Sequence, residues 1–313
     1  MLWVVDNRTF RRLMFEVLDH KPREEDIERF LRRLKEALGD RGLQVLGVTT
    51  DGSPLYPGPL ARVFGSARHQ VCRFHVIADI CQAVLRAVAK VRKALAAKMP
   101  RLPVGRPAAG AARRVARHKK RLEGKIKDLF ENRHLFVRHE LTPAQHRTLL
   151  HITRGMPELR RLREVMDEVY RLFDHRCRME TALAKLRKLR GRVRRFRKVG
   201  RALRTLFHPN MGKALNFLDD SLLPGTSNAV ERGNRRHRKM QKTVYSVRTR
   251  KNLVGRLALD MQRDQQRDER RATLRTMQEV RTPRLPRRRR LLKNAVHLHH
   301  TRRKRWLPEA RAG

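Results

Sequence analysis

The spacing of hydrophobic residues in the first quarter of the chain predicts alternating strands and helices. Ile27, Phe30 and Leu34 recur at helical spacing, whereas the segments on either side carry short apolar and β-branched runs. The expected elements are, in order, strands at 2–6 and 10–18, a helix at 23–38, a strand at 43–50, a helix at 59–64 and a strand at 69–74. This order is typical of an α/β fold, and a right-handed crossover would pair strands in parallel across the helix at 23–38.

Beyond residue 76 the pattern changes to long amphipathic helices. Few strand signals occur between residues 79 and 220, so this part predicts an all-α insertion. A Pro- and Gly-rich stretch at 100–110 reads as an exposed linker within it. The expected helices are 76–99, 111–130, 143–152, 157–173 and 179–207.

The end of the chain has a different composition. One more helix is expected after Asp260, and from Thr282 the sequence is rich in Pro and Arg with little periodicity, as in a disordered basic tail. The predicted regions are the first part of an α/β core at 1–78, a helical insertion at 79–222, a final core helix with an acidic residue at 223–265 and a basic helical or disordered tail at 266–313.

Charge narrows the choice of partners. The 77 Lys and Arg residues exceed the 30 Asp and Glu residues by enough to give a formal charge of +47, which indicates a polyanionic partner and at least non-specific binding of DNA or RNA. No apolar run approaches the ~20 residues that a membrane-spanning helix needs, and no signal peptide is seen. Three unpatterned cysteines indicate a reducing compartment. The sequence therefore predicts no membrane association and a cytoplasmic, nucleoid-associated location.

Asp51 is the first candidate for chemistry. It follows the apolar run at 43–50, and α/β folds place functional groups at the carboxyl ends of buried strands. It also precedes Gly52, and Asp-Gly is common in turns. The residues alone leave both interpretations open.

Glu231 is the second candidate, near the start of a predicted helix. If Asn228 is the N-cap, Glu231 falls at the N3 position and can close a capping box. Glu231 also shares a helix face with Arg235, Arg238 and Lys242, because the spacings are four, three and four. One acid followed by a basic track on the same face suits a carboxylate beside bound DNA.

Two blocks carry a resemblance to a known family. TTDGSPLYP at 49–57, followed by HQVCRFH at 69–75, resembles the central block of prokaryotic insertion-sequence transposases of the DDE type. The Cys72-x-x-His75 pair resembles the C/D(2)H signature of Mutator-like and related transposases. TSNAVERGNRRHRKMQKTVYSVRTRKNL at 226–253 resembles the part that carries the final acidic residue. Two motifs in the right order make this resemblance specific, and it extends from about residue 2 to about residue 260.

The resemblance implies an RNase H-like mixed-sheet core, interrupted by the all-α insertion, that cleaves DNA and transfers an insertion sequence. Such chemistry uses Mg²⁺ or Mn²⁺ held by carboxylates, with Asp51 as the shared ligand and Glu231 contributing from its helix. The expected partners are element ends and target DNA, with a homo-oligomer as a further expectation. A non-catalytic nucleic-acid-binding protein that retains the fold is the alternative, and a nuclease acting outside transposition is a third.

The first strand of such a core has no clear counterpart. By resemblance, the strands at 2–6 and 10–18 look like the second and third strands, which form a hairpin with Asp6 at its turn. The expectation is therefore an N-terminally truncated, inactive copy whose first strand and first catalytic Asp precede Met1. The competing assignment makes Asp6 the first metal ligand and the chain complete.

Cys72 and His75 have their own alternatives. A zinc site would recruit Cys81, but the spacing C-x₂-H-x₅-C matches no common structural zinc site. Cys72 alternates with Phe74 on the predicted strand, which favours packing. By resemblance, His75 lies near the active centre, where it would help to position DNA or the catalytic strand.

A basic run at 185–204 is the remaining candidate interface. It is either a solvated helix face or a helix that neutralises DNA phosphates through Arg194, Arg195 and Lys198, and the unbalanced charge of the chain favours DNA. Contacts of this kind position DNA without reading its sequence.

Overall fold

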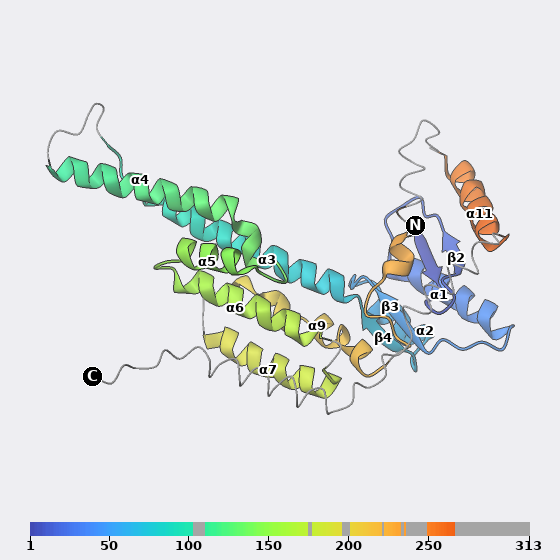
Figure 1. The fold of residues 1–313 in the computed structure, drawn as a ribbon. Coiled ribbons are helices and arrows are strands. Elements are labelled where there is room, and N and C mark those ends of the chain that lie inside the picture. The colour runs from blue at the N-terminus through green and yellow to red at the C-terminus, as the bar shows by residue number, and fades with distance from the viewer. Residues whose placement is uncertain are drawn as a thin grey trace. The chain divides into compact units, whose positions relative to one another are not determined.

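The computed structural model describes residues 1–102, 110–174, 177–195, 201–220, 222–232, 235 and 249–266. These residues form a mixed α/β structure that is mostly helical, with two small sheets (Figure 1). The chain separates into two compact units, Met1–Met261 and Gln262–Gly313. All described strands and both hydrophobic cores lie in the first unit.

The described residues contain four short strands in two sheets. In the antiparallel hairpin, Trp3 lies opposite Phe15, whereas the other pair is parallel and runs from Gly47 opposite Arg68 to Thr50 opposite Val71. The four predicted strands are therefore confirmed, with narrower bounds. They are β1 (Leu2–Val5), β2 (Arg12–Glu16), β3 (Gly47–Thr50) and β4 (Arg68–Val71).

The parallel pairing differs from the expectation. The predicted crossover spanned the helix at 23–38, but β3 pairs with β4 across α2 (Pro57–Val63). Strand β3 is also shorter than its apolar run, and Leu43 and Leu46 are exposed. The reason is that β4 begins at Arg68, opposite Gly47, so the register of the pair does not extend before Gly47, although the Leu46 carbonyl still accepts from the Arg68 backbone N–H at 3.1 Å.

Helix α1 (Glu24–Gly39) buries one apolar face, as its periodicity predicts. Its buried residues at helical spacing include Ile27, Phe30 and Leu34, which share a core with Leu2 of β1 and Leu60 of α2. Three acidic residues occupy its first turn, where the helix dipole favours negative charge.

The segment from residue 72 to 75 was assigned incorrectly from the sequence. It was expected to complete a strand, but β4 ends at Val71 and α3 (Arg73–Ala97) begins at once, with Cys72 at the junction. Val76, Ile80 and Val84 are buried at spacings of four, so the helical period extends back over this segment. Phe74, expected to alternate with Cys72 on a strand, is instead 59% exposed in the first turn of α3.

The expected helices beyond residue 110 are present, and their apolar faces meet in the larger core around Phe136, Leu159 and Leu186. At the end of the helix expected at 179–207, Arg204–Phe207 form instead a separate 3₁₀ turn that buries Leu206. The elements are α4 (Gly110–Glu131), η1 (Arg133–Phe136), α5 (Pro143–Ile152), α6 (Pro157–Leu172), α7 (Met179–Arg195), η2 (Arg204–Phe207), α9 (Asn210–Lys213) and η3 (Asn216–Leu218).

Helix α11 (Arg250–Gln266) returns to the β1–β2 hairpin through a buried ion pair. Arg12 Nη1 lies 2.7 Å from Asp260 Oδ2, and Arg12 Nη2 donates a hydrogen bond to the Asp260 carbonyl at 3.1 Å. Leu257 is buried on the same helix. None of the described helices is long and apolar enough to cross a membrane.

The start of α1 is held by a titratable pair. His20 Nε2 lies 2.8 Å from Asp26 Oδ2, and the Arg23 backbone N–H also donates to that oxygen at 3.0 Å. The pKa of Asp26 is lowered from its ordinary value of 3.8, first by the hydrogen bond with His20. The pKa of His20 is raised from 6.5, first by its hydrogen bond with Asp19 and then by the one with Asp26.

We expect Asp26→Asn to lower the free energy of unfolding most between pH 3.8 and pH 6.5, where Asp26 is ionised and His20 is protonated. The contribution of Asp26 is lost as the pH falls through its folded pKa, and that of His20 is lost as the pH rises through its folded pKa. Urea unfolding across this range measures the difference, with the exposed Glu36→Gln on the same helix as control. A loss of equal size at every pH would contradict the prediction.

Candidate functional site

The described residues 201–220 and 222–232, which follow α7 and are called the return segment, come back to the end of the parallel strand pair. Thr49 Oγ1 donates a hydrogen bond to the Pro224 carbonyl at 3.2 Å, and the Arg73 backbone N–H donates to the Gly225 carbonyl at 2.9 Å. The Ser227 backbone N–H then donates to Cys72 Sγ at 3.3 Å. These contacts place a helix that begins at residue 228 against the β4–α3 junction.

Gln70 on β4 is the most buried of the polar groups that hold this return. Its side chain is fully buried, its Nε2 donates to the Ala214 carbonyl at 3.0 Å, and its Oε1 accepts from the Phe217 backbone N–H at 3.0 Å. One amide therefore satisfies the backbone carbonyl at the end of α9 and a backbone N–H of η3. A buried amide of this kind stabilises a unique arrangement because each of its groups needs a partner.

Two asparagines complete the docking. Asn216 Nδ2 donates to the His69 carbonyl at 2.8 Å, and Asn210 Nδ2 donates to the Gly52 carbonyl at 3.0 Å. Gly52 has a φ of 93°, and an added Cβ would meet Val71 Cγ1 at 2.9 Å, so this turn requires glycine. These amide contacts could not be predicted from the sequence, since a single Asn or Gln produces no periodic signal.

Docking brings together three side chains from the two sequence blocks. The ligand atoms of Cys72, His75 and Glu231 all lie within 4.8 Å of one another, and His75 Nε2 is 3.9 Å from Glu231 Oε1. Cys72 is fully buried, whereas His75 and Glu231 are partly exposed. Sulfur, nitrogen and carboxylate oxygen together form a donor set suited to Zn²⁺ rather than to Mg²⁺, which prefers oxygen.

The capping box that was the structural alternative for Glu231 is absent, because the helix begins one residue earlier than the sequence suggested. Ser227, not Asn228, is the N-cap, and the Glu231 backbone N–H donates to the Ser227 carbonyl at 3.1 Å. Glu231 therefore lies one position beyond N3. Its Oε1 accepts from the Ser227 hydroxyl at 3.2 Å, which orients the carboxylate.

Asp51 lies at the carboxyl end of β3, as expected, and also starts the turn. Its Oδ1 accepts from the Ser53 backbone N–H at 3.0 Å, and its side chain is exposed. It is not part of the three-residue cluster, but its negative charge is one of the causes that raise the pKa of His75. The two interpretations of Asp51 left open by the sequence are thus compatible.

Hydrogen bonding and charge shift two pKa values at this junction. Burial alone would raise the pKa of Cys72, but hydrogen bonds from Ser227 and His75 outweigh burial and lower it. Burial alone would lower the pKa of His75, but its interaction with the Cys72 sulfur and the charges of Asp51 and Glu231 raise it. The charges of Asp51 and Glu231 therefore favour the protonated form of the His75 imidazole.

Asp6 lies at the turn of the β1–β2 hairpin. Its Oδ1 accepts from the Arg8 backbone N–H at 2.8 Å, and its Oδ2 accepts from the Thr9 backbone N–H at 3.2 Å and from the Thr9 hydroxyl. The carboxylate thus has the partners of an ordinary turn aspartate. Among the described residues, it joins no group with the spacing of metal ligands.

The remaining cysteine candidate lies elsewhere. Cys81 Sγ is 3.7 Å from the Tyr170 hydroxyl, and Cys81 is not among the three clustered side chains. Cys81 is therefore not a member of the cluster. This agrees with the sequence spacing, which argued against a zinc site formed by Cys72, His75 and Cys81.

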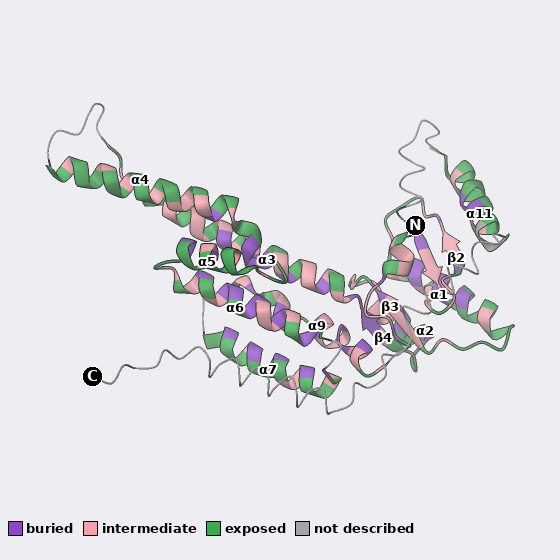
Figure 2. Cartoon of the chain, viewed as in Figure 1, coloured by how far each residue is buried: buried purple, intermediate pink, exposed green. Residues whose placement is uncertain are grey.

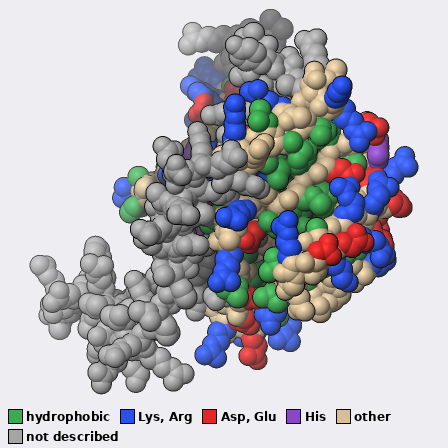
Figure 3. All heavy atoms as spheres, turned by 90° about the vertical axis from the view of Figure 1, so that its right-hand side faces the viewer, with side chains coloured by type: hydrophobic (Ala, Val, Ile, Leu, Met, Phe, Trp, Pro, Cys, Tyr) green, Lys and Arg blue, Asp and Glu red, His purple; other side chains and the backbone are tan. Residues whose placement is uncertain are grey.

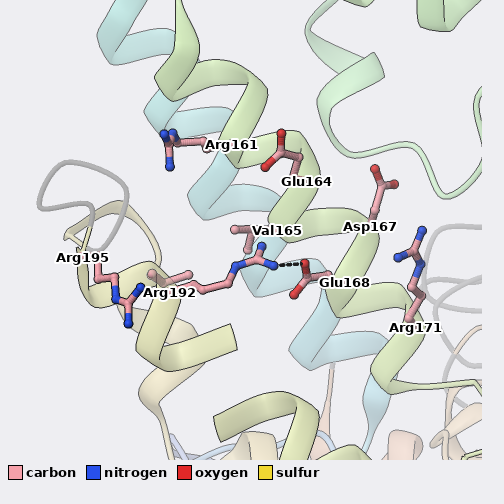
Figure 4. A pocket seen from close by; sticks show the side chains of 9 residues that line it. Arg161, Glu164, Val165, Asp167, Glu168, Arg171, Arg192 and Arg195 are labelled. Atoms are coloured by element: carbon pink, nitrogen blue, oxygen red, sulfur yellow. Dashed lines mark ion pairs between the residues drawn. The ribbon is translucent and has the colours of Figure 1, made fainter. Parts of the chain in front are cut away.

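The basic residues expected to bind DNA have different surroundings. Arg194 lies over the Phe207 ring at 5.3 Å. Arg195 lines a groove between α6 and α7 in which Arg192 pairs with Glu168 at 2.6 Å (Figure 4). Arg235 is an exposed helical residue. The other three, Lys198, Arg238 and Lys242, lie outside the described residues.

Comparison with known families identifies the chain. A model of the transposase family DDE_Tnp_ISL3 matches residues 2–257, which include both sequence blocks and all three clustered side chains. The chain belongs to this transposase family. No curated protein and no solved structure matches it. The resemblance to insertion-sequence transposases is confirmed, whereas the relation to Mutator-like transposases stays a prediction.

In this member of the transposase family, we expect Gln70→Met to lower the free energy of unfolding by about 1–3 kcal/mol for each backbone group left without a partner. Methionine keeps the length of the side chain but cannot hydrogen-bond to Ala214 or Phe217. Urea unfolding measures the loss. The control is the exposed Gln82→Met on α3, expected to stay within about 0.5 kcal/mol of the parent. Equal effects of the two substitutions would contradict the role of Gln70.

Proposed function

We propose that this protein is a DDE-type transposase that cleaves DNA at element ends and joins them to target DNA. The observation that carries the proposal is the docked return segment, which brings Glu231 to the β4–α3 junction, near His75 and the charge of Asp51. Membership of a transposase family supports it. We further propose that the hairpin, the parallel pair and α1 are parts of an RNase H-like core, with the helices after α3 as an insertion.

We propose Asp51 and Glu231 as the carboxylates that hold Mg²⁺ or Mn²⁺. Their oxygen donors fit a hard cation, whereas Cys72 and His75 do not. When bound, such ions activate the attacking oxygen and stabilise the leaving one. Ser227 orients the Glu231 carboxylate, and the turn at Ser53 fixes Asp51.

His75 is proposed as a positioning residue between these acids. A protonated imidazole reduces the repulsion between the two carboxylates and offers a cationic donor to a DNA phosphate. The buried Cys72 is among the groups that raise the pKa of His75. The predicted partners are element ends and target DNA, and a homo-oligomer and a nucleoid-associated cytoplasmic location remain part of the proposal.

A non-catalytic DNA-binding protein is the second candidate. It is favoured by Asp6, whose carboxylate is engaged by its own turn and not by the cluster at the junction. Two divalent cations are held less firmly by two carboxylates than by three. In this alternative the fold and the basic surface remain while cleavage is lost.

In an active form of the protein, we expect Asp51→Asn and Glu231→Gln each to reduce metal-dependent nicking of supercoiled plasmid to background while leaving DNA affinity nearly unchanged. Metal-binding carboxylates act on the transition state rather than on the binding of phosphates in the ground state. Nicking is measured with Mg²⁺ or Mn²⁺ and again with EDTA, and affinity is measured by fluorescence anisotropy.

Asp6→Asn serves as the matched control, because Asp6 is a carboxylate in the same unit that is engaged by its own turn. Nicking that survives Glu231→Gln would remove Glu231 from the site. Nicking lost on Asp6→Asn would make Asp6 a ligand. An unaltered chain that binds DNA but never nicks it would favour the non-catalytic candidate.

A further inference from the structure

Basic residues are distributed unevenly over the described surface. From Ile80 to Leu122 the sequence contains no Asp or Glu, although it contains many Lys and Arg residues. The described part of this stretch is most of α3 and the N-terminal half of α4, and α4 packs against α3 (Figure 1). An acid-free stretch of this length is unusual in a protein that pairs its charges elsewhere.

The N-terminal half of α4 is exposed (Figure 2). No ion pair or hydrogen bond joins its five exposed Lys and Arg side chains to another described residue. Like charges four residues apart on a helix cost a few tenths of a kcal/mol per pair, and this half of α4 has no acid to offset them. The basic stripe consists of Arg113, Arg114, Arg117, Lys120 and Arg121.

Helix α1 provides the contrast. Its arginines pair with carboxylates, as in Arg29 with Asp26 at 2.7 Å and Arg33 with Glu16 at 3.1 Å. Figure 3 shows a face of the molecule on which Lys and Arg lie among Asp and Glu. Such positive charges are already neutralised and have less to gain from a phosphate.

Helix α7, which the sequence favoured as the DNA-facing helix, also uses its arginines internally. Arg190 Nε donates to the Leu206 carbonyl at 2.8 Å, Arg192 pairs with Glu168, and Arg194 lies over Phe207. These side chains attach α7 to its neighbours, whereas those of the basic stripe make no comparable contact with described residues.

We propose that the basic stripe of α4 is a surface for the phosphates of duplex DNA. The proposal deepens the proposed function, because it takes DNA as the substrate and names the helix that holds it. Residues 110–122 span roughly 20 Å at ~1.5 Å per residue, a length along which one DNA strand presents about six phosphates. Arg113, Arg117 and Lys120 lie on one face at spacings of four and three, so their heads can follow a single strand. Phosphate contacts of this kind carry no sequence preference.

The test compares two variants that lose the same charge. In the α4 variant R113Q/R117Q/K120Q/R121Q, glutamine keeps the helix propensity and removes four phosphate ligands. In the α1 variant R29Q/R32Q/R33Q/R62Q, three arginines of α1 and Arg62 of α2, which pairs with Glu28 of α1, are replaced. The affinity of each full-length protein for a short labelled duplex of random sequence is measured over a range of salt concentrations, with circular dichroism to check folding.

We expect the slope of log affinity against log salt to fall by up to about 3.6 in the α4 variant, at about 0.9 per lost phosphate contact, and by less than about 1 in the α1 variant. Replacing Arg113, Arg117 and Arg121 by lysine should keep the slope near that of the parent, because a point charge suffices for phosphate. If the lysine variant binds DNA like the parent, the weaker binding of the glutamine variant results from lost charge and not from a folding defect.

Equal slopes for the two glutamine variants would overturn the proposal, since only total charge would then matter. A loss of duplex RNA binding with unchanged DNA binding would also overturn it. The salt slopes test DNA binding by the basic stripe and do not depend on catalysis. If Asp51→Asn left nicking unchanged, the proposed catalytic role of Asp51 would be wrong, but the prediction for the salt slopes would stand.

Discussion

Docking of the return segment on the parallel strand pair is the interaction on which the rest of the candidate site depends. The Arg73 and Ser227 backbone N–H groups bind across the junction, to the Gly225 carbonyl and to Cys72 Sγ respectively. Without these bonds Glu231 would have no fixed position relative to His75. The long separation along the sequence is a small obstacle, since each doubling of loop length adds only about 0.6 kcal/mol to the cost of closing it.

The return segment is held on β4 by polar contacts, and these contacts explain why it docks in one position. Apolar packing alone would let α9 and η3 slide over β4, because hydrophobic contact is non-directional. Gln70 prevents sliding, since its two amide groups meet one carbonyl and one N–H in different turns of the return segment. A shift of one residue would break both of these hydrogen bonds, although Gln70 Nε2 would keep the one that it donates to the Val71 carbonyl at 2.6 Å. The position of Glu231 is therefore determined indirectly by a glutamine that takes no part in the proposed chemistry.

Periodicity predicted the strands, most helices and the position of Asp51, because each depends on local spacing of apolar residues. The segment at 72–75 was assigned incorrectly because Cys72 and Phe74 alternate like a strand, while the helical period of Val76, Ile80 and Val84 becomes decisive only when a core is present. The amide contacts of Gln70 were not predictable, since their partners lie more than 140 residues away. Glu231 was recognised through its motif, but its cap depended on a helix start that shifted by one residue.

Binding of cations by carboxylates and binding of DNA phosphates by basic residues are assigned to different parts of the sequence. Carboxylates that hold cations must be near DNA, yet their negative charge repels it. Here the candidate acids Asp51 and Glu231 belong to the two outer blocks, whereas the acid-free stretch from Ile80 to Leu122 lies between them in sequence. The basic stripe, which makes no ion pair with described residues, can bind phosphates while the charge of the candidate acids acts locally on His75. This acid-free stretch contributes part of the formal charge of +47.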